Sequence, residues 1–107
     1  SLPAIEFDGV ASEAFRAVTS TVTLDENDNR VYIGTLSANI TLNLPACNAT
    51  RDKWIYDFKK KGADAFAFVL DPNSTETIDG VSTITVFGQR TICIQCVNGE
   101  GWYTIGN

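Results

Sequence analysis

Apolar and polar residues alternate along short segments of this chain, and polar turn residues separate the segments. Residues 39–46 show the alternation clearly, because Ile40, Leu42 and Leu44 stand at every second position before Pro45 ends the segment. A period of two places these side chains on one face of a β-strand. Comparable segments, rich in β-branched and aromatic residues, lie at 21–25, 30–35, 53–61, 66–71, 77–80, 82–87, 91–97 and 101–106.

These segments predict an all-β domain, a small antiparallel β-sandwich or jelly-roll-like barrel of about eight short strands over residues 19–107. Residues 1–18 are assigned to an N-terminal connecting segment, in which 11–18 suit one or two helical turns. The polar run DENDN, residues 25–29, predicts a hairpin turn between the first two strands. The chain opens Ser-Leu-Pro without Met, so we expect it to be a piece of a longer protein.

Length and charge narrow the classes of partner. At 107 residues the chain has the size of one domain with its own core. Its formal net charge of −5 argues against nucleic-acid binding, which gains affinity from clustered Lys and Arg. The basic run Lys59, Lys60 and Lys61 is short and predicts a solvated strand end. No apolar run approaches the ~20 residues of a membrane span, so we expect no membrane insertion.

The chain has three cysteines, an odd number, so at least one is unpaired and a dense disulfide framework is excluded. Cys93 and Cys96 form a CxxC inside a predicted strand, where positions three apart point to opposite faces. That placement argues against a shared metal ion or a mutual disulfide. It favours the cysteines as small buried apolar residues.

The turn-rich segment LDPNSTETIDG, residues 70–80, brings together side chains suited to a metal ion or a sugar hydroxyl. Asp71 with Glu76 or Asp79 is its candidate pair of glycoside-cleaving carboxylates. The chain contains no histidine, which removes the commonest general base and zinc ligand. Asp-Pro and Asp-Gly are also turn signals, so the segment is interpreted mainly as a corner between strands.

A second acidic run, residues 25–29, places Asp25, Asn27 and Asn29 at alternate positions, as a calcium loop does. Arg30 stands where that loop requires Gly, so the run does not fit an EF-hand; a looser calcium site stays open. We therefore assign no catalytic residues, no metal ligands and no cofactor.

Aromatic side chains are the other means by which a small β domain binds a ligand, by stacking on sugar rings or filling a partner's pocket. Trp54, Tyr56, Trp102 and Tyr103 are candidates, together with Asn73 from the turn segment. Trp102 and Tyr103 are neighbours on one strand, so we expect one of them in the core and the other at the surface.

Several stretches of the chain resemble a module of bacteriophage tail-fibre, tail-spike and other appendage proteins. The resemblance covers residues 19–107 and rests on Leu44-Pro45, Val69-Leu70-Asp71-Pro72, Glu76-Thr77-Ile78-Asp79-Gly80 and Gly101-Trp102-Tyr103-Thr104-Ile105. It implies a β-rich domain, commonly trimeric, with no catalytic residues. The chain departs from the module in its three cysteines and in residues 47–54, where the module is often Gly-rich.

The resemblance implies a virion structural domain, expected to be a homotrimeric receptor-binding domain of a fibre or spike that contacts a host-surface polysaccharide or protein. A capsid decoration or neck protein, which binds other virion proteins, is an alternative within the same class. Two alternatives from other classes stay open: a stand-alone carbohydrate-binding module, and a glycan-cleaving enzyme built on Asp71 and Glu76.

Overall fold

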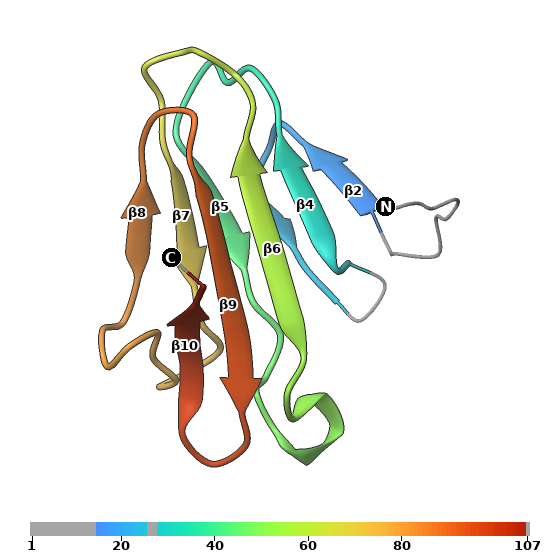
Figure 1. Cartoon of the computed structure of the whole chain (residues 1–107). Helices are drawn as coiled ribbons and strands as arrows, with labels where there is room; N and C mark the ends of the chain where they lie inside the picture. Colours follow the sequence, from blue (N-terminus) through green and yellow to red (C-terminus); the bar gives the residue numbers. More distant parts are fainter. Residues whose placement is uncertain (1–14, 26–27, 107) are drawn as a thin grey trace.

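The computed structural model describes residues 15–25 and 28–106, which form two β-sheets packed face to face (Figure 1). The five-stranded sheet has the order β10-β9-β6-β4-β2, and the four-stranded sheet has the order β3-β5-β7-β8. The strands are β2 (Phe15–Val18), β3 (Val22–Thr23), β4 (Arg30–Ile33), β5 (Ile40–Asn43), β6 (Ile55–Lys60), β7 (Phe68–Asp71), β8 (Ile84–Val86), β9 (Thr91–Val97) and β10 (Gly101–Ile105). A 3-10 turn, η1 (Ala49–Arg51), lies between β5 and β6.

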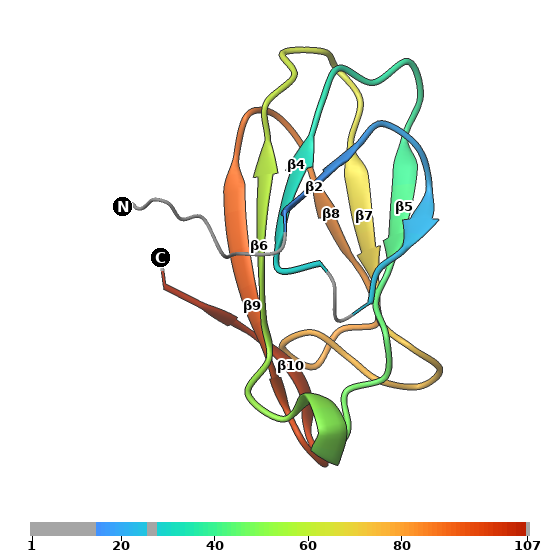
Figure 2. The same cartoon turned by 90° about the vertical axis from the view of Figure 1, so that its right-hand side faces the viewer.

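The all-β prediction is confirmed, and the sheets form a sandwich rather than a closed barrel. The antiparallel prediction holds only in part, because both sheets are mixed. The strands β2, β4 and β6 run parallel in one sheet and β3, β5 and β7 run parallel in the other, whereas β9 is antiparallel to β6 and β10, and β8 is antiparallel to β7. The cause is the path of the chain, which crosses from one sheet to the other at each connection from β2 to β7 (Figure 2). After two crossings the chain is back in the sheet where it started and runs in the same direction, so the two strands are parallel.

Two local predictions are also wrong. The strands β3 and β4 lie in different sheets, so a hairpin turn does not join them as predicted for residues 25–29, of which 26 and 27 lie outside the described residues. Phe15–Val18 forms a strand paired with β4 instead of helical turns, so the five-stranded sheet includes residues assigned to the connecting segment. The rest of that segment, residues 1–14, lies outside the described residues.

The core lies between the two sheets and follows the predicted alternation. Ile40, Leu42 and Leu44 are all buried there, as expected from their period of two. Tyr56 lies at the centre of an aromatic group, with its ring centroid 5.8 Å from Phe58 and 5.5 Å from Trp102. Burying such rings contributes about 1.5–3 kcal/mol each.

The described part of the chain has no helix long and apolar enough to cross a bilayer.

Lys60 contradicts the prediction of a solvated basic strand end. Its side chain is 0% exposed, because position 60 follows Tyr56 and Phe58 on the inward face of β6. The ammonium donates to the Gly62 carbonyl and to Asp64, each at 2.9 Å. The charge is buried with its hydrogen bonds made, which is the condition under which proteins tolerate a buried charge.

The cysteines also differ from the prediction. Cys47 and Cys96 form a disulfide between residues 49 positions apart, so they are a crosslink and not separate apolar residues. Cys93 is a free, half-buried thiol. This agrees with the odd number of cysteines, which leaves at least one of them unpaired. The prediction that Cys93 and Cys96 do not pair is confirmed.

Candidate functional site

A pocket of about 300 Å³ lies between the turn segment after β7 and the hairpin that joins β9 to β10. Its walls are mostly polar groups from two stretches that are distant in sequence. The lining residues are Cys47, Thr75, Glu76, Thr77, Gly99, Glu100 and Gly101.

Backbone hydrogen bonds join the two walls. The Trp102 N–H donates to the Thr77 carbonyl at 2.8 Å, and the Asp79 N–H donates to the Trp102 carbonyl at 2.9 Å. Gly101 permits this close approach, because its φ is +108° and an added Cβ would lie 2.9 Å from the Thr77 oxygen. The segment around Ile78 therefore covers the outer edge of β10 like a short parallel strand.

Glu76 connects the pocket to the disulfide. Both of its carboxylate oxygens accept from the Cys47 N–H, at 3.0 and 3.2 Å. Cys47 is in turn bonded to Cys96 on β9, so the turn segment, the loop after β5 and the five-stranded sheet are held together at this point. The arrangement fixes the position of Glu76 before any ligand arrives.

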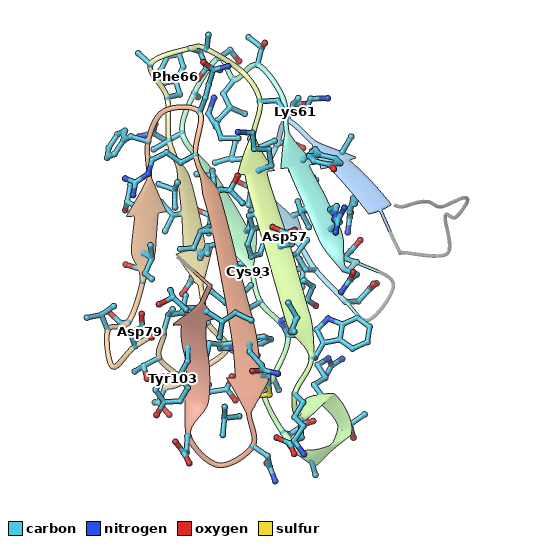
Figure 3. The ribbon with its side chains drawn as sticks, in the orientation of Figure 1. Asp57, Lys61, Phe66, Asp79, Cys93 and Tyr103 are labelled. Atoms are coloured by element: carbon cyan, nitrogen blue, oxygen red, sulfur yellow. A yellow bond between two sulfur atoms is a disulfide. The ribbon has the colours of Figure 1, made fainter. Side chains whose placement is uncertain are left out.

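Tyr103 lies beside the pocket on the outward face of β10, with 39% of its surface exposed (Figure 3). Its hydroxyl donates to Glu100 Oε1 at 2.9 Å, and Glu100 lines the pocket. That hydrogen bond, followed by the negative charge of Glu100, raises the pKa of the Tyr103 hydroxyl, and Asp79 adds to the effect. The ring is therefore a neutral stacking surface next to carboxylate acceptors.

Asp79 is held on the same side of β10 by the neighbouring strand residue. Its Oδ1 accepts from the Thr104 N–H at 3.0 Å, and its Oδ2 accepts from the Thr104 hydroxyl at 2.6 Å. Asp79 has a φ of +51°, a left-handed conformation that Asp adopts more readily than most residues. The Asp-Gly turn thus reverses the chain after Ile78 and caps the edge of β10.

The structure divides the five predicted binding residues. Tyr103 and Asn73 are exposed, and Trp54 is half-buried with its ring edge-on to Tyr56 at 6.3 Å. Tyr56 and Trp102 are core residues at 0% and 1% exposure, so they cannot present their rings to a ligand. The expected division between Trp102 and Tyr103 is found, with Trp102 inside.

The candidate carboxylate pair receives no support from the geometry. Each candidate pair joins Asp71 to a carboxylate that already has a structural partner, because Glu76 accepts from the Cys47 backbone and Asp79 accepts from Thr104. Within the described ranges, no group of three or more His, Cys, Asp or Glu side chains could hold a metal ion. The pocket offers hydroxyl, carboxylate and backbone groups for hydrogen bonding.

Sequence reasoning did not identify Glu100, Gly101 or Cys47 as parts of the site. Gly99, Glu100 and Gly101, at the connection between two predicted strands, form the pocket's second wall. Cys47 carried no local signal, because its role depends on contacts with residues 76 and 96.

A second hollow of about 290 Å³ lies against the other end of the five-stranded sheet, beside Tyr32 and Lys61. The Lys61 ammonium lies 5.3 Å from the centroid of the Tyr32 ring, a cation–π contact. No carboxylate lines this hollow, whereas Glu76 and Glu100 line the first, so the pocket beside Tyr103 is the candidate site.

Comparisons with protein-family models, curated proteins and solved structures gave no match to this chain.

Proposed function

We propose that the chain is a non-catalytic domain of a bacteriophage appendage, which binds a host-surface polysaccharide or protein as part of a tail fibre or spike. One observation carries the proposal. Two stretches on which the resemblance rests, residues 76–80 and 101–105, form a single unit through the Thr77–Trp102 and Asp79–Trp102 hydrogen bonds. Residues that resemble the module thus build the candidate pocket.

The chemistry of the pocket favours a carbohydrate ligand. Sugars present hydroxyl groups for hydrogen bonding and C–H faces for stacking on aromatic rings. Glu100, Thr75 and Thr77 supply the first kind of contact, and the exposed Tyr103 ring supplies the second. Carboxylates repel acidic sugars, so we propose a neutral or amino-bearing glycan.

The disulfide supports a location on an extracellular particle. Disulfides persist in oxidising surroundings such as virion and cell surfaces, and they are rare in the cytosol. The Cys47–Cys96 bond joins the pocket wall to β9, so a reducing environment would loosen the site. A homotrimer, implied by the resemblance, is part of this proposal.

The test is binding of the purified chain to host-envelope polysaccharides and to a neutral-glycan array. Tyr103→Ala should weaken binding about tenfold or more, as loss of a stacking anchor does. The matched control is Phe87→Ala, which removes an exposed ring directly after β8. Equal binding by Tyr103→Ala and the unaltered chain would contradict the proposed site.

The same pocket favours a second candidate, a stand-alone carbohydrate-binding module. Light scattering separates the two, because this alternative requires Tyr103-dependent glycan binding by a chain that never forms a trimer. A trimer that binds the glycan supports the appendage domain.

A further inference from the structure

Among the described strands, β8 is the last of the four-stranded sheet, so its outer edge has no neighbouring strand (Figure 1). In β7, the carbonyls of Ala67 and Asp71 accept from β5, so odd-numbered residues of that strand face β5 and even-numbered residues face β8. Phe68 and Leu70 pair with Val86 and Ile84, which therefore bond inward. The N–H and C=O of Thr85 point away from the sheet.

This edge has neither cover nor charge among the described residues. Residues 81–89, VSTITVFGQ, contain no ionisable side chain. Val81 and Phe87 bracket the strand and are 50% and 56% exposed. Soluble proteins usually protect a sheet edge with a charge, a proline or a covering segment.

The other sheet edges carry such protection. The edge of β10 is covered by residues 77–79, through the hydrogen bonds to Trp102. On β2, Arg16 pairs with Asp28 at 2.9 Å, and its guanidinium also lies 3.5 Å from the Thr23 carbonyl on β3. The edge of β8 therefore stands apart within the described part of the chain.

We propose that β8 pairs with β8 of a second copy of this chain, antiparallel and centred on Thr85. In that register Thr85 exchanges both backbone hydrogen bonds with its symmetry mate, and Thr83 pairs with Phe87 of the other copy. Ile84 lies opposite Val86, so the buried apolar row continues from one four-stranded sheet into the next. The edge is complementary to itself, as a twofold interface requires.

Charge favours a second copy over a charged partner. Each chain carries a net charge of −5, so two copies repel unless they meet where neither has charge, and residues 81–89 meet that condition. A charged peptide would find no counter-charge on this edge. The contact is short, well below the ~1,200–2,000 Å² of stable interfaces, so association is weak and reversible.

The β8 contact goes beyond the proposed function, because it lies on the opposite sheet from Tyr103 and does not require a trimer. It doubles whatever assembly the chain already forms, from monomer to dimer or from trimer to hexamer. If the chain does not form a trimer, the β8 proposal still stands. If its mass does not double, the proposed trimer still stands.

The first experiment measures mass by sedimentation equilibrium from about 1 μM to 1 mM. The unaltered chain should double in mass as concentration rises, and Thr85→Pro should weaken doubling about tenfold or more. Proline removes an N–H that points outward, so the β7–β8 ladder is kept. Phe87→Ser should also weaken doubling, whereas the control Tyr103→Ser should not. A mass independent of concentration would overturn the proposal.

A second measurement needs no variant. In a mixed sample of isotope-labelled and unlabelled chains, the proposed register places the Ile84 and Val86 α-protons of different copies in direct contact, as in a non-hydrogen-bonded pair. We expect an intermolecular nuclear Overhauser effect between them at high concentration. A doubled species that lacks this signal would show that the copies meet elsewhere and would reject the β8 register.

Discussion

Lys60 and Asp64 form an ion pair inside the fold, with the lysine Nζ 2.9 Å from the aspartate Oδ2. Asp64 also accepts from the N–H groups of Leu36 at 2.8 Å and Phe66 at 2.9 Å. The end of β6 is thereby tied to the loops that lead into β5 and β7. Gly62 allows the tight path, because an added Cβ would lie 2.6 Å from the Gly34 oxygen.

The ion pair predicts that removing only its anion destabilises the fold more than removing both charges. Asp64→Asn leaves the buried Lys60 ammonium without an anion, so we expect it to lower the melting temperature more than Lys60→Met combined with Asp64→Asn. Thermal unfolding followed by circular dichroism measures both. Lys61→Met, at an exposed position, is the control and should lose no more than its cation–π contact with Tyr32, about 0.5–1 kcal/mol. A double variant less stable than Asp64→Asn would contradict the prediction.

The same aspartate predicts an acid-dependent loss of stability. Its backbone hydrogen bond from Leu36, then its bond from Lys60, lower the pKa of Asp64 from 3.8 to about 2. A depressed folded-state pKa means that the stabilisation is full above pH 3.8 and is lost as pH falls toward 2. Melting temperatures measured across this window should fall more steeply for the unaltered chain than for Asp64→Asn. Parallel curves would show that Asp64 does not contribute.

Removing the disulfide should lower the stability of the fold substantially. Closing a loop of 49 residues restricts the unfolded chain, so replacing Cys47 and Cys96 with alanine should lower the free energy of unfolding by about 4 kcal/mol. Urea denaturation measures this loss, and a reductant should reproduce it in the unaltered chain. Cys93→Ala is the control and should stay within about 1 kcal/mol, because that thiol is only half-buried.

The backbone conformation of Gly101 should affect both the stability of the fold and ligand binding in the pocket. Gly101→Ala forces a side chain into a φ of +108° and against the Thr77 oxygen, so it should cost about 2 kcal/mol or more and weaken glycan binding. Gly106→Ala has a φ of +79° with no atom within 4 Å of the added Cβ, and should cost about 1 kcal/mol. Equal losses for the two variants would show that the contact with Thr77 is unimportant.

The candidate site was predictable only in part. Tyr103 and Asn73 were chosen by residue type and are exposed, whereas Tyr56 and Trp102 were chosen in the same way and are buried. An aromatic side chain suits a core and a binding surface equally well. Local sequence gave no reason to join the turn at 73–80 with Glu100, since that contact depends on how the last hairpin packs.

Local pattern alone determined most of the strand positions, though not β2, and which side chains of a strand share a face. The period of two places Ile40, Leu42 and Leu44 in the core, because a strand of any pairing sends alternate side chains to one face. Only the tertiary structure decided which sheet each strand joins, and hence that the strands from β2 to β7 pair in parallel while β9 and β10 form a hairpin. It also decided that Cys47 bonds Cys96 and that Lys60 is buried against Asp64. These outcomes depend on residues that meet only after the chain has crossed between the two sheets, so no local pattern records them.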